Sequence, residues 1–339
     1  MSERIIFAEG TGINDSVFGK SQAPIKAMIE QNVEAFEQMS MIDKIYYMDN
    51  TTKYAAKYTS ETSMGDFEDV GENGAYPLSS FREGYSKVIE PSTWKNKFEV
   101  TQEMIEDADI GKVKSRANIF STSYNRTREK FAASLLVGGM NAKTKIGSKT
   151  YDTTSADGKP LFAADHPSIT NSKFSESNIF SYTAASDQFK VILDHAQEKM
   201  QGFKDDDGNL LTVAPNTIVI PNSGDMKRKV FEAVASELDP NSNNNAFNFQ
   251  VGLWNVLVWN YLPTTLNGKE YFMLMDSKFN EDYMCMPWVD RLKLSVKSDI
   301  DPNTDANVWR GRARFSAGFN NWRSIAIVGD GISGGTSIS

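Results

Sequence analysis

The residues best suited to chemistry are few in this chain. It has two histidines, His166 and His195, and one cysteine, Cys285, too few nitrogen and sulfur ligands for a transition-metal site and too few thiols for an intrachain disulfide. His166 lies between Asp165 and Pro167 with no second histidine or cysteine near it in sequence, which favours a turn-stabilising hydrogen bond over catalysis. His195 falls inside a predicted helix. We therefore expect no catalytic residue, no cofactor and no metal.

Three short motifs resemble functional loops without meeting their requirements. Residues 331–335 (GISGG) match the nucleophile-elbow pattern, but only four residues follow where the elbow needs a helix. Residues 205–208 (DDDG), aligned with a calcium loop, put Phe203 and Ala214 at ligand positions, so a tight polar turn is expected instead. Residues 10–12 (GTG) lack the third glycine of a dinucleotide fingerprint. Hydrolase, calcium-binding and nucleotide-binding functions have no support.

Charge and hydropathy narrow the class of protein further. The formal net charge of −8 opposes tight binding to nucleic-acid phosphates, which needs a concentrated basic face. The basic run 226–229 (MKRK) is explained by a solvated helix face. Residues 1–10 lack the pattern of a secretory signal, and no apolar window is long enough for a membrane span. We expect a cytosolic protein that, if DNA is nearby, contains it and does not bind it tightly.

A long segment near the N-terminus predicts an arm. Residues 1–20 show neither helical nor strand period, and residues 23–39 have the apolar spacing of a helix with Pro24 in its first turn. Strand-like alternation over 54–58 and 94–101 flanks a glycine-punctuated stretch, so the two runs predict the strands of an extended hairpin.

The aromatic residues of this stretch need a cover that an isolated hairpin cannot provide. Two interpretations remain open. The hairpin is either a flap folded over its own domain or an arm that packs on a neighbouring subunit. The rings concerned are Phe67, Tyr76, Phe81 and Tyr85.

The rest of the chain predicts a mixed α+β fold. Apolar residues repeat at helical spacing from Val113 to Leu135 and predict a long helix ending at Gly138 and Gly139. The run 253–261 is apolar on both alternating faces and predicts a central, doubly covered strand. We further expect loops and a short hairpin over 141–180, helices over 186–200 (capped by Ser186) and 226–238, an asparagine-rich loop over 239–249, strands over 217–220, 271–275, 308–319 and 325–328, and a tail over 329–339.

This order of elements resembles the HK97-like capsid fold. The stretch 157–167 (DGKPLFAADHP) resembles the segment after the spine helix in Mu-like major head subunits of tailed bacteriophages, and 98–107 (FEVTQEMIED) and 309–327 are also similar to that family. The resemblance implies an N-terminal arm and helix (1–49), an extended β-hairpin loop or E-loop (50–97), a peripheral domain (98–180 and 285–328) with its spine helix at about 112–137, an axial domain (181–284) and a C-terminal tail (329–339).

The function that this resemblance implies is structural. The chain would be a major capsid protein, not an enzyme, that self-assembles as hexamers and pentamers into an icosahedral shell around phage double-stranded DNA. Its partners would be other copies of itself, a portal, a scaffold and possible decoration proteins, with no membrane. It would be assembled in the host bacterial cytoplasm and located in the virion capsid. The alternatives are an encapsulin-like compartment shell and a monomeric tail or binding protein.

Charge suggests how the subunits would meet. The extended loop is acidic, the spine region is basic, and the loop tip is predicted to dock on the spine helix of a neighbour, with exposed ion pairs setting register and apolar burial supplying affinity. The expected intersubunit residues are Glu61, Asp66, Phe67, Glu68, Asp69, Tyr76, Phe81, Tyr85, Arg116, Arg126 and Arg128.

Overall fold

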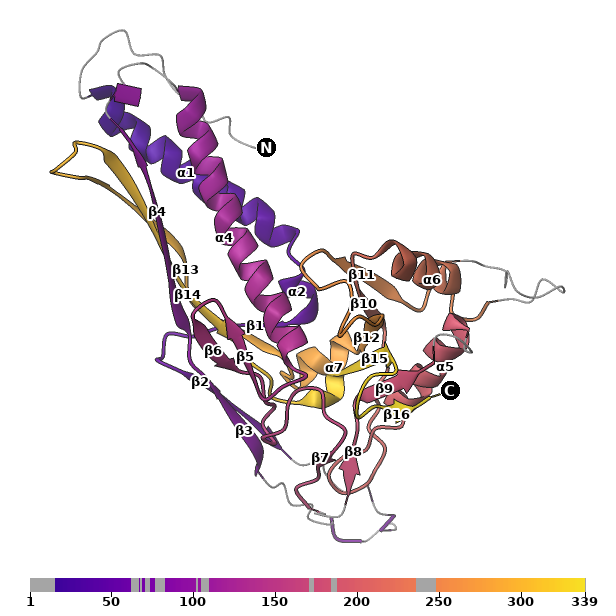
Figure 1. Ribbon diagram of the computed structural model, residues 1–339. Coiled ribbons are helices and arrows are strands. Elements are labelled where there is room, and N and C mark those ends of the chain that lie inside the picture. The colour runs from indigo at the N-terminus through magenta and orange to yellow at the C-terminus, as the bar shows by residue number, and fades with distance from the viewer. Residues whose placement is uncertain are drawn as a thin grey trace.

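The computed structural model describes residues 16–61, 67, 69–70, 74–76, 83–101, 103–104, 110–170, 174–183, 188–235 and 248–338. Side chains are described for these residues except 16–24, 61 and 110. The described elements form an elongated lobe and an α/β lobe, joined by a shared core (Figure 1).

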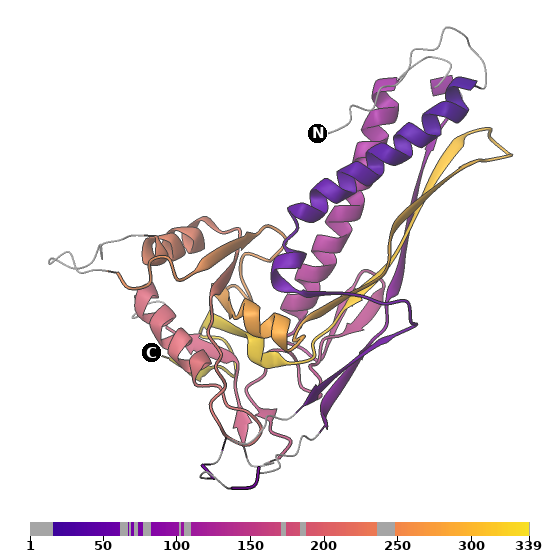
Figure 2. The ribbon, with the colours of Figure 1, turned by 180° about the vertical axis from the view of Figure 1, so that it is seen from behind.

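The elongated lobe consists of two helices and a four-stranded sheet. Helix α1 (Ser16–Gln38) lies along α4 (Ile110–Gly138), and both extend beside the sheet (Figure 2). The strand order is β1 (Tyr47–Asn50), β13 (Pro287–Ile300), β14 (Asn307–Ala317) and β4 (Ser92–Val100). A short helix, α2 (Ile42–Ile45), leads from α1 into β1.

Apolar spacing on α4 explains how this lobe packs. Val113, Ala117 and Phe120 lie three or four residues apart, so they share one helix face, and all three are buried. They form a cluster with Ile25 and Ile29 of α1 and with residues of the sheet. Helix and sheet approach closely at Gly311 of β14, where an added Cβ atom would lie 2.4 Å from Cζ of Phe120.

The α/β lobe is built on a six-stranded sheet. Its order is β11 (Asn255–Trp259), β10 (Thr217–Pro221), β12 (Tyr271–Met275), β15 (Ile325–Asp330), β9 (Ile179–Tyr182) and β16 (Thr336–Ser337). Helices α5 (Phe189–Gln201) and α6 (Gly224–Val234) pack against each other and bury apolar stripes; α7 (Ser277–Asp282) and the 3-10 turn η1 (Trp322–Ser324) complete the lobe. One core cluster includes this sheet and the end of α4, which joins the lobes.

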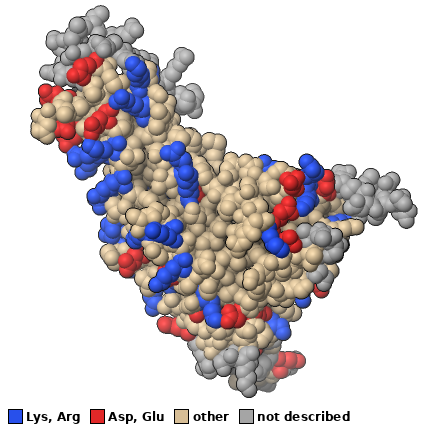
Figure 3. Space-filling view, in the orientation of Figure 1, with Lys and Arg blue, Asp and Glu red and all other residues tan. Residues whose placement is uncertain are grey.

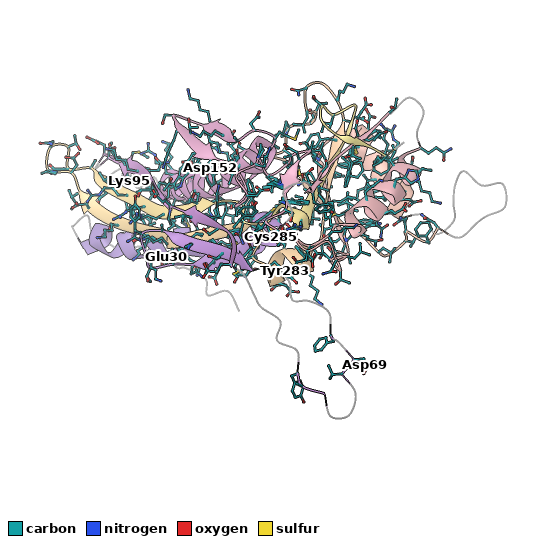
Figure 4. The ribbon with its side chains drawn as sticks, turned by 90° about the horizontal axis from the view of Figure 1, so that it is seen from below. Glu30, Asp69, Lys95, Asp152, Tyr283 and Cys285 are labelled. Atoms are coloured by element: carbon teal, nitrogen blue, oxygen red, sulfur yellow. The ribbon has the colours of Figure 1, made fainter. Side chains whose placement is uncertain are left out.

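A two-stranded hairpin projects from the body. Strand β2 (Ala56–Glu61) pairs antiparallel with β3 (Glu83–Ile89), and Asp69, which lies between them in sequence, is placed away from both lobes (Figure 4). Two further hairpins, β5 (Lys143–Ile146) with β6 (Lys149–Asp152) and β7 (His166–Pro167) with β8 (Ser175–Glu176), lie in the segment where loops and a short hairpin were predicted.

The predicted long helix is confirmed by α4, and the predicted strands over 217–220, 271–275, 308–319 and 325–328 are confirmed by β10, β12, β14 and β15. The extended conformation predicted for residues 1–20 is wrong where the structure describes it, because 16–20 already belong to α1, and Pro24 lies inside that helix. The Ser186 cap and most of the asparagine-rich loop lie outside the described residues.

Three strand predictions need correction. The partner of β2 is β3, whereas 92–100 pairs with β14 in the four-stranded sheet, so the predicted loop boundary at residue 97 falls inside β4. Strand β11 is at the sheet edge and not central; its apolar residues are explained by core packing on both faces. Residues 329–339 are not simply a tail, because β16 pairs with β9 and Ile338 is buried.

The expected division into peripheral and axial domains stays a prediction. Half of β9 and most of β15 fall within the predicted peripheral ranges, and both strands belong to the same sheet as β10 and β12. Domain boundaries drawn along the sequence cannot describe a sheet whose strands come from segments far apart in the chain.

Candidate assembly surfaces

The base of the hairpin is fixed to its own chain. Tyr58 and Ile89 bury their side chains against Val289 of β13. The hydroxyl of Tyr58 donates a 2.5 Å hydrogen bond to Asp49. Burial raises the pKa of Tyr58, and this hydrogen bond raises it further. Lys87 Nζ lies 2.7 Å from Asp152 Oδ2. The flap interpretation therefore holds for the base of the hairpin.

The tip of the hairpin is exposed. Phe67 and Tyr76 have relative exposures of 104% and 98%, and Asp69 is also exposed. Tyr85, lower on β3, is half-buried, and burial raises its pKa. Of the other residues predicted here, the Glu61 side chain, Asp66, Glu68 and Phe81 lie outside the described residues. Two of the four predicted rings thus have no cover from the residues that the structure describes.

The three predicted arginines of α4 differ in their surroundings. Arg126 is exposed. Arg116 donates a hydrogen bond to the carbonyl oxygen of Glu99 at the end of β4. Arg128 is 4% exposed, so a docking role for it has to be dropped because a neighbouring subunit cannot reach a side chain enclosed by its own chain.

Arg128 is the centre of a buried charge network between α1, α4 and the sheet. Its guanidinium lies 2.8 Å from Glu37 of α1 and 3.1 Å from Asp290 of β13, and it packs 5.3 Å from the ring centroid of Trp288. Trp288 donates a hydrogen bond to the second oxygen of Asp290. Burial raises the pKa of Asp290, and the charge of Arg128 opposes that rise. A buried charge of this kind needs its partners for the fold to be stable.

Glu129, the next residue, joins the two lobes. One carboxylate oxygen accepts hydrogen bonds from the Ser40 hydroxyl and the Met41 amide, and the other accepts from Trp259 Nε1 at 2.7 Å. Glu129 and Trp259 are both buried. This side chain therefore connects α4 to the entry of α2 and to edge strand β11.

The histidine segment is structural, as the sequence predicted. His166 Nδ1 lies 2.6 Å from Asp157, its Nε2 lies 3.3 Å from Asn178, and its ring stacks on Trp322 at 4.3 Å. Burial acts to raise the pKa of Asp157, but its hydrogen bond with His166 and further hydrogen bonds lower it overall.

The other chemical motifs also form structure. Asp205 accepts the amides of Asp207 and Asn209 in a tight turn. His195 Nδ1 lies 2.6 Å from the carbonyl oxygen of Ile338, and a strand, not a helix, follows 331–335. In the part of the chain that the structure describes, no cluster of side chains suits a metal ion and no helix is both long and apolar enough to cross a membrane.

A basic groove on the four-stranded sheet was missed by sequence reasoning. It lies on the sheet face opposite α4, which we call the open face, and has a volume of about 580 Å³. The register of β4 with β14 places Lys97 opposite Arg310 and Lys95 opposite Arg312. On the other edge of β14, the register with β13 places Lys297 opposite Arg310. Lysine and arginine side chains are numerous over this lobe (Figure 3). The alternation of lysines in β4 and arginines in β14 was a usable signal, but only strand pairing unites them.

The described residues of the open face carry an excess of positive charge. Two cations pair with exposed acids: Lys97 with Glu99 at 2.5 Å, and Arg310 with Asp299 at 2.5 Å. The remaining cations of the groove, which make no ion pair with any described residue, are Lys95, Lys297 and Arg312.

Comparisons with known proteins agree with this architecture. A family model described as phage capsid protein matches residues 84–328, well over half of the chain. The capsid of Ralstonia phage GP4 is 9% identical, with a TM-score of 0.54 and coverage of 84% of this chain and 85% of that one. The capsid of Myoviridae phage XM1 is 11% identical, with a TM-score of 0.50 and coverage of 86% and 92%. The comparison with curated proteins gave no match.

At such low sequence identity, the similarity to the two capsid structures shows the fold alone. It agrees with the expected α+β, HK97-like capsid architecture. A special likeness to Mu-like head subunits stays a prediction. The family match extends from the hairpin strand β3 to β15 and so includes the spine helix and all strands of both sheets except β1 and β16. The chain belongs to the phage capsid protein family and is a structural major capsid protein.

Proposed function

We propose that copies of this chain assemble, as hexamers and pentamers, into a closed icosahedral shell around phage double-stranded DNA. Family membership supports a shell-building role. Assembly in the host bacterial cytoplasm, a portal, a scaffold and decoration proteins belong to the same proposal. The capsid family match favours this function over an encapsulin-like compartment or a monomeric tail protein.

The observation that carries the proposal is the exposed tip of the hairpin. Phe67 and Tyr76 present nearly their whole surfaces to solvent, and Asp69, between them in sequence, lies away from both lobes (Figure 4). Covering one large apolar side chain contributes about 1.5–3 kcal/mol. In a shell, this free energy is gained at every subunit whose rings are covered. A second copy that covers both rings therefore binds more tightly, and neither copy has to change its fold.

The two lobes support a division of roles in this shell. The elongated lobe, with α4 as its spine, would form the peripheral part, and the α/β lobe would form the axial part that meets other copies around the symmetry axes. Residues 241–245, which fall in the expected axial domain, lie outside the described residues. This assignment is supported by the HK97-like order of elements.

The test is to replace the exposed rings and follow assembly. We expect Phe67→Ser with Tyr76→Ser to leave the subunit folded, by circular dichroism, but to remove most shells from electron micrographs of purified protein. Leu210→Ser, at an exposed apolar side chain of the α/β lobe, is the matched control and should still assemble. A wild-type chain that stays monomeric at high concentration would contradict the proposed function.

A further inference from the structure

We infer that the exposed side of α4 and the β5–β6 hairpin bind the phosphate backbone of duplex DNA and therefore line the inside of the shell. We call this surface the α4 basic face, and its exposed cations include Arg126, Lys130, Lys143 and Lys145. The inference rests on the proposed function and deepens it, because it states which side of the subunit meets the enclosed DNA.

The charge of this segment sets it apart from the rest of the chain. Residues 111–151 contain nine lysines and arginines and one acidic residue, Glu129, whereas the whole chain has a net charge of −8. Glu129 is buried, so it does not neutralise the surface. Figure 3 shows lysine and arginine side chains over α4 and the β5–β6 hairpin. A basic surface on an otherwise acidic protein favours a polyanionic partner.

The cations of the α4 basic face are closely spaced and have no acidic partners. Arg126 and Lys130 are four residues apart, so they lie on one side of α4 and about 6 Å apart along its axis. Lys143 and Lys145 share one side of β5, roughly 7 Å apart. All four are exposed and make no ion pair with a described residue. In the groove of the open face, by contrast, two of the cations pair with acids.

The surface around these cations suits DNA better than it suits another protein. Exposed hydroxyl side chains accompany the cations at Thr122 and Ser134 on α4 and at Thr150 on the hairpin, and hydroxyl groups commonly donate to phosphate oxygens. Ile119 is the one exposed large apolar side chain among residues 111–151. A stable protein interface needs a more apolar core than this face provides.

The acidic hairpin tip is placed on the other side of the subunit. In Figure 4, Asp152 of β6 and Asp69 lie on opposite sides of the body. Copies in a closed symmetric shell turn the same side inward. Duplex DNA carries one negative charge per about 1.7 Å of its axis, so its repulsion from the shell is smallest when the basic side faces inward. Each contact is weak, since non-specific dissociation constants are about 10⁻⁴–10⁻⁶ M, and this agrees with a chain that does not bind DNA tightly.

Salt-dependent DNA binding by the full-length, unassembled chain tests the inference. Arg126→Gln with Lys130→Gln and Lys145→Gln removes three cations that make no ion pair with a described residue, and glutamine suits a helix as well as lysine does. Folding should therefore persist. Affinity for a short fluorescent DNA duplex of arbitrary sequence should fall about tenfold, and the slope of log affinity against log salt concentration should become shallower by about 3.

The matched control removes three cations elsewhere. Lys44→Gln with Lys53→Gln and Lys278→Gln changes exposed side chains outside the α4 basic face, and this variant should bind the duplex as the wild type does. A second measurement concerns orientation. Empty shells of the wild-type chain should bind little added duplex, because the α4 basic face is then enclosed.

The outcomes separate this inference from the proposed function. Unchanged DNA binding by the α4 variant, or an equal loss in the control, would overturn the inference while leaving shell formation intact. Shells that bind added duplex as well as the free subunit does would place the face outside and would also overturn it. An α4 variant that binds DNA normally but forms no shells would overturn it in favour of a contact with another subunit. A wild-type chain that forms no shells would instead contradict the proposed function.

Discussion

The charged side chains on the two faces of the four-stranded sheet differ in whether they have ion-pair partners. On the helix-facing side, Arg128 is enclosed and has Glu37 and Asp290 as partners in its own chain. On the open face, Lys95 and Arg312 are exposed and make no ion pair with a described residue. The enclosed charges therefore stabilise the subunit itself. The charges of the open face are exposed and remain available to a partner.

Removing Arg128 should have the largest effect on stability. Arg128→Ala leaves Asp290 buried without its main opposing charge, and breaking a buried pair in this way costs about 3–5 kcal/mol. Urea unfolding of the unassembled subunit measures the loss. A cost below about 1 kcal/mol would contradict the role of the network and weaken the contrast between the two faces.

Asp290→Asn should cost less and should change the pH dependence. The amide keeps an acceptor for Trp288, so we expect a loss of about 1.5–3 kcal/mol at neutral pH from the weakened contact with Arg128.

The sign of the pH dependence follows from burial, which raises the folded-state pKa of Asp290 above its usual value of 3.8. An acid with a raised pKa adds stability as the pH falls through the folded-state value toward 3.8. The variant should lack this component, so the difference in stability between wild type and variant should grow over that range. A difference that does not change with pH would contradict this assignment.

Gly311→Ala tests the close approach of helix and sheet on the enclosed side. The added Cβ atom would overlap the ring of Phe120, and the repacking should cost about 1–2 kcal/mol. Thermal unfolding of the subunit is the measurement. Gly224→Ala, where nothing lies within 4 Å of the added atom, is the control and should be neutral, since alanine also suits a helix better than glycine.

Local patterns predicted the helices and strands well, because burial imposes the same period on sequence and structure. The stripe of Val113, Ala117 and Phe120 defined α4, and the alternation of Arg310 and Arg312 defined β14. Strand partners were harder to predict. Strand β3 has Gly84, Tyr85, Ser86 and Lys87 in a mixed pattern, and its neighbour β4 had a clearer alternation that was assigned to the hairpin instead.

The candidate surfaces also differ in how easily the sequence predicts them. The acidic tip was evident because its residues are contiguous in sequence. The basic groove was not, because Lys95 and Arg312 become neighbours only through the pairing of β4 with β14. Arg128 was misassigned because a helical period of charged residues does not distinguish a solvated face from an enclosed one, and its partners Glu37 and Asp290 come from distant segments.

Arg310→Gln should have the smallest effect on the subunit and gives the sharpest contrast with Arg128→Ala. Its partner Asp299 is exposed, as Arg310 is, and such pairs contribute about 0–1 kcal/mol because water screens them. Urea unfolding should therefore change little, whereas light scattering should show slower assembly, since one cation of the groove is lost. If unfolding free energy and assembly fall together, the open face stabilises the subunit just as the enclosed face does, and the distinction between the two faces disappears.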